Sequence, residues 1–82
     1  DLPTRAWIEE QLHQRWQGLE IASNIVRLTL HYLDGKIEVE LCLPVEAYPR
    51  DEDQYAELRK LVSAAEGLDE VRGIELLFES AQ

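Results

Sequence analysis

The sequence predicts an α+β fold in the order α-β-β-α-β, with a three-stranded mixed sheet and two helices on one of its faces. Three observations lead to this prediction. Two alternating apolar runs flank Asp34-Gly35, a pattern typical of a β-hairpin. The segments before and after this hairpin carry apolar residues at helical spacing, and a third alternating run closes the chain. We expect residues 1–82 to form a single domain.

The predicted hairpin lies within Ile25–Val45 and is the best-defined element. Asp-Gly favours a two-residue type I′ turn, because that turn needs positive φ at both central positions. Counting outward from the turn pairs apolar with apolar residues on one face, so the turn and the alternation specify the same register. The predicted pairs on that face are Tyr32–Ile37, Leu30–Val39, Leu28–Leu41 and Val26–Leu43, and those on the other face are Leu33–Lys36, His31–Glu38, Thr29–Glu40 and Arg27–Cys42.

The first helix is predicted between a cap at Asp1 or Thr4 and an end at Gly18. Pro3 fits the first turn or its approach. Polar residues fill the other positions of the segment, which indicates one face toward the core and one toward water. The apolar stripe that defines the core face consists of Ile8, Leu12, Trp16 and Leu19.

The second helix follows a loop between Pro44 and Pro49. The acidic run 51–53 is suited to the positive end of this helix, and Gly67 is suited to a left-handed C-cap. A final strand is predicted at 71–79, with Gly73 at a bulge or a close approach. The helix presents an apolar stripe of Tyr55, Leu58, Leu61, Val62 and Ala65, and the strand presents one of Ile74, Leu76 and Phe78.

The second strand, second helix and last strand form a β-α-β unit, so these two strands should be parallel, with the second strand central. This arrangement is a ferredoxin-like or metallochaperone-like sandwich with one sheet face open to solvent. Ligand-type side chains and Leu77 are expected on the open face. The residues predicted there are Arg27, Thr29, His31, Glu38, Glu40, Cys42, Glu75, Leu77 and Glu79.

The net charge of −9 disfavours nucleic acid and anionic lipid as partners. A single cysteine, Cys42, excludes an internal disulfide, and no apolar run is long enough to span a bilayer.

No glycine-rich phosphate loop and no nucleophile–histidine arrangement is apparent, so we do not expect an enzyme. Because the chain opens on Asp1 rather than methionine, we expect an excised domain or a processed chain.

Two groups of side chains are candidates for a cation site, and each also has an ordinary interpretation. His31 beside Glu38 combines zinc-ligand types, but a solvated histidine in a weak ion pair is the interpretation we prefer. The acidic run 51–53 offers oxygen ligands, but helix capping explains it as well. The core of so small a domain has little room for three large aromatic side chains, those of Trp7, Trp16 and Tyr48. We therefore expect at least one of them at an interface.

The chain resembles the cytoplasmic C-terminal domain of cation diffusion facilitator transporters, which export zinc and related divalent cations. The resemblance covers Trp7 through Phe78 and is clearest in WIEEQLHQRWQG, LTLHYLDGKIEVELCL, DEDQYAELRKLVSAAEGL and VRGIELLFE. It implies a V-shaped homodimer whose closure responds to cation binding. It also implies a transmembrane transport domain upstream and a cytoplasmic location.

The ligand positions implied by the resemblance hold few histidines in this sequence. Arg27 stands near the usual first histidine, with His31 displaced toward the turn. The second position falls at Glu40, the third at Asp53 and the last at Glu79. Carboxylates there favour harder or weaker cation binding. We therefore expect a homodimeric regulatory domain with a weak or degenerate carboxylate-based site for zinc or a similar divalent ion, or with dimerisation alone retained. The alternative is a ferredoxin-like protein-interaction module, alone or fused, without a metal function.

Overall fold

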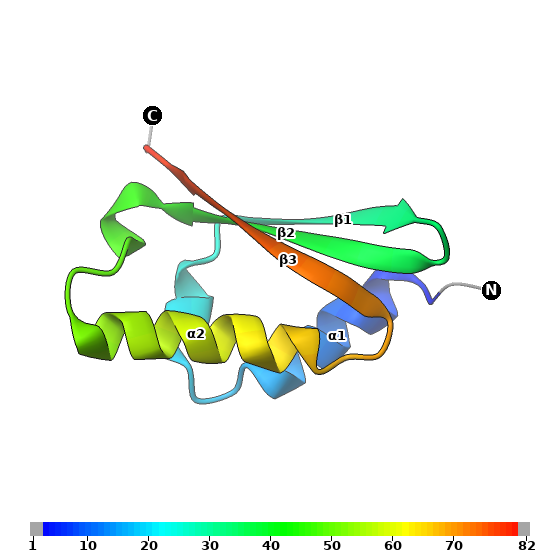
Figure 1. Cartoon of the computed structure of the whole chain (residues 1–82), viewed down its shortest axis with the longest axis horizontal. Coiled ribbons are helices and arrows are strands. Elements are labelled where there is room, and N and C mark those ends of the chain that lie inside the picture. The colour runs from blue at the N-terminus through cyan, green and yellow to red at the C-terminus, as the bar shows by residue number, and fades with distance from the viewer. Residues whose placement is uncertain (1–2, 81–82) are drawn as a thin grey trace.

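The computed structural model describes residues 3–80 and has the predicted α+β architecture. One three-stranded sheet, in the order β1-β2-β3, is covered on one face by two helices (Figure 1). Within the described residues, no helix has the length and apolar character needed to cross a membrane. The elements are α1 (Arg5–Arg15), η1 (Glu20–Asn24), β1 (Arg27–Leu33), β2 (Lys36–Pro44), η2 (Val45–Ala47), α2 (Glu52–Glu66) and β3 (Val71–Glu79), where η denotes a 3₁₀ helix.

The hairpin has the predicted turn and the predicted register. Asp34 and Gly35 have φ values of 48° and 79°, as a type I′ turn requires. The antiparallel pairs run from Leu33 opposite Lys36 to Arg27 opposite Cys42, which confirms the register counted from the sequence. Because side chains alternate between the two faces of the sheet, this register alone decides which alternate residues of each strand face the core.

β3 pairs with β2 in parallel, so the β-α-β prediction and the central position of β2 are both confirmed. The ladder shifts by one residue between Ile37 and Glu38, which pair with Val71 and Gly73 respectively. Arg72 is the additional residue of this irregularity. A Cβ added to Gly73 would meet no atom within 4 Å, so Gly73 marks the predicted bulge and not a close approach.

The core lies between the sheet and the helices. Apolar side chains of β2 are fully buried against α1 and α2, and a buried hydrogen bond joins the helices where the Trp16 indole Nε1 donates to the Leu61 carbonyl at 2.9 Å. Trp16 is therefore a core residue with its polar atom satisfied. The buried apolar residues of this core are Ile8, Leu12, Trp16, Ile21, Ile37, Val39, Leu41, Leu43, Leu61, Ala65, Leu68 and Val71.

Both helices have side-chain N-caps. Thr4 accepts from the Trp7 amide at 3.2 Å, and Asp51 accepts from the Gln54 amide at 2.9 Å. α1 ends at Arg15, three residues before the predicted stop. The predicted left-handed C-cap at Gly67 is wrong, because its φ is −71°.

The Arg15 side chain lies against Gly67 at this end of α2. A Cβ at Gly67 would lie 2.7 Å from the guanidinium Nη1 of Arg15. The same Nη1 donates to the Ala64 carbonyl at 3.3 Å. Since this is the far end of a flexible, exposed side chain, a side chain at position 67 would displace it at little cost, and neither packing nor φ requires glycine there.

Two predicted core residues of the first run are exposed. Val26 is 66% exposed and precedes β1, so the predicted Val26–Leu43 pair is not part of the ladder. Tyr32 is 43% exposed although its partner Ile37 on the central strand is fully buried, because β1 is an edge strand. Conversely, Ile21 of η1 is buried, although this connection has no periodic apolar pattern. The helices therefore cover less of β1 than the alternation predicts, and η1 adds to the core.

Replacing Trp16 with phenylalanine tests the buried helix–helix hydrogen bond. We expect W16F to lower the free energy of unfolding by about 1–2 kcal/mol, since it removes the donor to Leu61 and part of the buried ring. Urea unfolding followed by circular dichroism measures this. The matched control W7F, at an exposed position, should stay within about 0.5 kcal/mol of the parent. Equal losses in the two variants would contradict this role for Trp16.

Candidate functional site

The sheet face opposite the helices carries two ion pairs and one histidine–carboxylate contact, which join neighbouring strands or span the sheet. Arg27 of β1 reaches across β2 to Glu79 of β3, with Nη2 and Oε2 3.3 Å apart. His31 Nε2 lies 3.0 Å from Glu40 Oε1. A longer pair at 3.8 Å joins Arg72 to Glu38. All are solvent-exposed, so each contributes little to stability, but together they organise the charges of this open face.

His31 and Glu40 form the closest contact between predicted ligand residues. His31 stands opposite Glu38 in the register, as predicted, but its ring contacts Glu40 diagonally across the ladder. On the other side of β2, Glu40 stands opposite Glu75. Two carboxylates in register on one face repel each other. Among residues 3–80, no basic side chain forms an ion pair with Glu75, so this repulsion is offset only from the His31 side.

The four predicted metal ligands do not converge. His31 and Glu40 are in contact, Glu79 is engaged by Arg27, and Asp53 lies in the first turn of α2, on the helical layer. Within the described part of the chain, no group of three or more His, Cys, Asp or Glu side chains is arranged to hold a metal ion. A structural zinc site needs four protein ligands and a catalytic one usually three. The residues present therefore do not fit a closed zinc site.

Cys42 lies on the open face and is nevertheless only 2% exposed. It stands between Arg27 and Leu77 in the sheet register, beneath the Arg27–Glu79 ion pair. Burial raises the pKa of the Cys42 thiol, and the neighbouring Glu79 carboxylate raises it further. The thiol is therefore neutral and shielded, which is the opposite of a reactive or metal-binding cysteine.

An apolar groove runs between α2 and the outer edge of β3. It is a hollow of about 280 Å³, and at its end the rings of Tyr48 and Phe78 meet edge to face with centroids 5.0 Å apart. The neighbouring Tyr48 raises the pKa of Tyr55. The groove is lined by Tyr55, Leu58, Arg59, Val62, Ser63 and Leu76.

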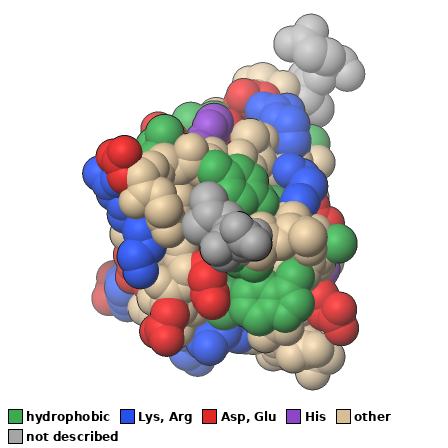
Figure 2. Space-filling model, turned by 90° about the vertical axis from the view of Figure 1, so that its right-hand side faces the viewer, with side chains coloured by type: hydrophobic (Ala, Val, Ile, Leu, Met, Phe, Trp, Pro, Cys, Tyr) green, Lys and Arg blue, Asp and Glu red, His purple; other side chains and the backbone are tan. Residues whose placement is uncertain are grey.

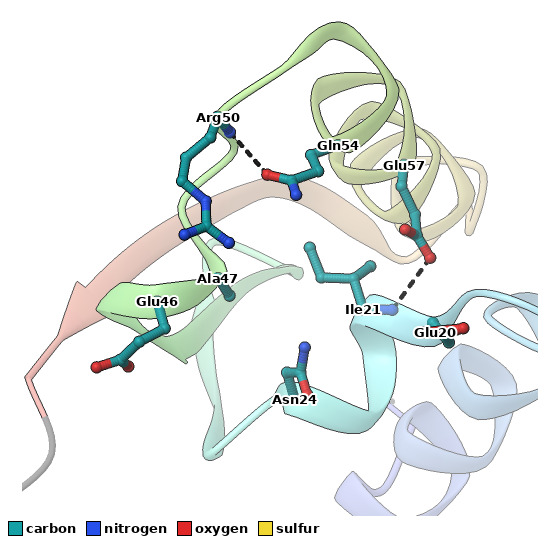
Figure 3. Close-up of a pocket in the computed structure, with 8 residues that line it drawn as sticks. All are labelled: Glu20, Ile21, Asn24, Glu46, Ala47, Arg50, Gln54 and Glu57. Carbon is teal, nitrogen blue, oxygen red and sulfur yellow. Dashed lines mark hydrogen bonds between the residues drawn. The ribbon is translucent and has the colours of Figure 1, made fainter.

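A second hollow, of about 210 Å³, is polar and lies where η1, η2 and α2 meet (Figure 3). Glu57 accepts from the Ile21 amide at 3.2 Å, and the Arg50 amide donates to Gln54 at 2.7 Å. These bonds fix η1 and the η2–α2 loop to the helix, which is a structural role. The sequence could not indicate this hollow, because its residues come from separate elements without a common spacing. They are Glu20, Ile21, Asn24, Glu46, Ala47, Arg50, Gln54 and Glu57.

Figure 2 views the end of the molecule that carries the hairpin turn, where hydrophobic side chains lie among acidic, basic and uncharged ones. We take the open face and the α2–β3 groove as the candidates for an interface, because the first carries the cross-strand charge pairs and the second is an apolar hollow. Comparisons with known protein families, with curated proteins and with solved structures gave no match.

The buried state of Cys42 gives a chemical test of the open face. We expect the native thiol to react with a disulfide reagent at least about tenfold more slowly than in urea. Because the pKa of Cys42 is higher in the folded chain than in the unfolded chain, the protonated thiol favours the folded state. This stabilisation is complete below the pKa of the unfolded chain and is lost as the pH rises through the pKa of the folded chain. E79Q should lower that pKa and speed labelling.

The matched control is E75Q, which leaves the Arg27–Glu79 pair intact and should label at the parent rate. Labelling is followed by absorbance, and unfolding by circular dichroism across the alkaline range. Fast labelling of the native parent protein would show that Cys42 is accessible, contrary to its burial.

Proposed function

We propose that the chain is a regulatory homodimerisation domain of the kind found in divalent-cation efflux transporters, acting in the cytoplasm beside a transmembrane transport domain. The observation that supports this proposal is the α-β-β-α-β sandwich with one sheet face left free of helices. That arrangement agrees with the family the sequence resembles. A domain of this size also buries only part of its surface, so a partner adds stability.

The open face is suited to a second copy of itself. A two-fold interface brings the same surface together twice, so a face with charges of one sign repels its copy. This face instead mixes basic residues with glutamates around the half-buried Leu77 and the buried Cys42. A mixture of both signs allows basic residues of one copy to pair with glutamates of the other. The basic and acidic residues in question are Arg27, His31, Arg72, Glu38, Glu40, Glu75 and Glu79.

Any cation on this face is expected to bind weakly. His31 and Glu40 provide an imidazole and a carboxylate in contact, with Glu75 beside Glu40 in the register. Two or three such donors leave one or more coordination positions to water or to a second copy of the chain. A site of this kind has low affinity and responds to dimerisation, since the second copy completes it.

The second candidate is a protein-interaction module without a metal function. The α2–β3 groove favours it, because a groove lined by Tyr55, Leu58 and Val62 suits an apolar partner. The two candidates differ in which surface is used, the open face or the groove. Substitutions on each surface therefore distinguish them.

Replacing Leu77 with lysine tests dimerisation through the open face. We expect the parent chain to be dimeric at high micromolar concentration and L77K to raise the dimer dissociation constant at least about tenfold, since two added charges repel across the two-fold axis. Light scattering with sedimentation measures this. The control V45K changes an exposed apolar residue in η2 and should leave the dimer intact. A monomeric parent at these concentrations would refute the proposal.

Calorimetric titration with zinc and manganese tests the cation site. We expect weak binding that E40A abolishes, because Glu40 is the carboxylate in contact with His31. The matched control is D53A, which removes a carboxylate from the helical layer and should leave binding unchanged. If both variants lose the same heat, or the parent shows none, the signal comes from the general acidity of the chain or is absent, and the cation site is rejected.

A further inference from the structure

We propose that the outer edge of β3 binds an extended peptide segment in which aliphatic and basic residues alternate, added to the sheet as a fourth strand. Three features of β3 converge on this occupant: an unpaired main-chain edge, an apolar hollow on its helix side and an acidic hollow on its open side. The inference is independent of the proposed function, because all three features belong to a single copy of the chain.

The first feature is the difference between the two edges of the sheet. At the β1 edge, the Arg5 guanidinium donates to the Leu28 carbonyl at 2.6 Å and so occupies part of the strand's outer side. Within residues 3–80, the main chain from Arg72 to Glu79 has hydrogen bonds only in its ladder with β2. The outer amides and carbonyls of β3 are therefore available to an added strand.

The second feature is the apolar groove on the helix side of β3. Leu76 forms its floor on the strand, and Leu58 and Val62 of α2 form its wall. The hollow of about 280 Å³ is large enough for one or two aliphatic side chains of a neighbouring strand. In an added strand every second residue points to this side. The groove therefore selects aliphatic residues at alternate positions.

The third feature lies on the opposite side of the same strand. A hollow of about 320 Å³ opens between Glu38 and Glu75, over the backbone of Gly73 and Ile74. Gly73 has no side chain and leaves this space open, and Arg72 pairs with Glu38 at 3.8 Å, so Glu75 is the carboxylate of this hollow without an ion pair among residues 3–80. Glu75 also stands opposite Glu40. A lysine or arginine from the added strand would reach this hollow and reduce the repulsion between the carboxylates.

The chain already contains a strand of the proposed chemistry on the other side of β2. In β1 the helix-side residues Leu28 and Leu30 alternate with Arg27 and His31, and these last two contact glutamates of the open face. From the β3 side, Arg72 pairs with Glu38, but Glu75 has no basic partner among residues 3–80. A strand of the same pattern beside β3 would supply a cation to Glu75, which is the charge complementarity that identifies the occupant.

A second copy of β3 fits this edge less well. Antiparallel pairing of two copies about the middle of Val71–Glu79 would set Glu75 against Glu75. Like charges directly opposite destabilise a strand pair, and each chain already carries a net charge of −9. The charges therefore favour a basic partner segment over self-association at this edge.

The test uses synthetic peptides of nine residues, the length of β3. The probe alternates Lys or Arg with Val or Leu, one control replaces its basic residues with glutamate, and another carries N-methylated backbone amides. Two-dimensional NMR of the labelled chain should show amide shifts on titration with the probe along β3 and the groove side of α2. We expect both control peptides to bind at least about tenfold more weakly, because one loses the charges and the other the edge hydrogen bonds.

Matched variants separate a specific site from general attraction to an acidic protein. E75Q should weaken the probe about threefold to tenfold, since it removes the unpaired carboxylate at the edge. E10Q removes an exposed carboxylate of α1 and should leave affinity unchanged. Circular dichroism confirms that both variants are folded. Equal weakening by the two variants would overturn the proposal, since binding would then follow net charge alone.

Two further results would overturn it. The first is binding of the N-methylated peptide as tight as that of the probe, which excludes strand addition. The second is a concentration-dependent shift of the β3 amides without peptide, which shows that a second copy occupies the edge. If L77K abolishes the dimer while the probe peptide still binds, the first result supports homodimerisation through the open face and the second supports strand addition at β3. Probe binding to a monomeric chain would support this inference and count against homodimerisation.

Discussion

The turn at Asp34 and Gly35 is the constraint on which the rest of the structure depends. Positive φ at both residues permits a two-residue loop, and that loop fixes which residue of β1 stands opposite which residue of β2. A slip by one residue would move every apolar side chain of one strand to the other face. The core, the open face and the contact between His31 and Glu40 all follow from this one register.

β2 transmits that register to the rest of the molecule because it is paired on both sides. Its helix-side residues fill the core, and its open-face residues sit between the side chains of β1 and β3. Cys42 is shielded, and Glu40 is placed between a histidine and a glutamate, for this reason. The bulge at Arg72 and Gly73 adjusts β3 to the same ladder and opens the hollow beside Glu75. The open face is thus determined by strand pairing, without support from a second layer.

Most of the fold could be predicted from the sequence, because alternation, helical spacing and the Asp-Gly turn are local signals that agree with one another. The errors arose where tertiary geometry decides: the exposure of Val26 and Tyr32, the backbone of Gly67 and the burial of Ile21. The candidate ligands were placed on the correct strands. Their grouping was not predictable, because Glu79 is engaged by Arg27 and His31 turns to Glu40 rather than Glu38. The α2–β3 groove depends on the position of α2 relative to the edge strand β3. The spacing of apolar residues along the sequence does not determine that position.

The Arg5–Leu28 hydrogen bond bears on how such a domain avoids unlimited aggregation. A sheet with two free edges can add copies at both and grow into a filament, as open head-to-tail association does. Here an arginine from the first turn of α1 binds one outward carbonyl of β1, whereas β3 has no such side-chain contact within residues 3–80. A charged side chain thus protects one edge of the sheet against strand addition, so the two edges are unequal as sites for further pairing.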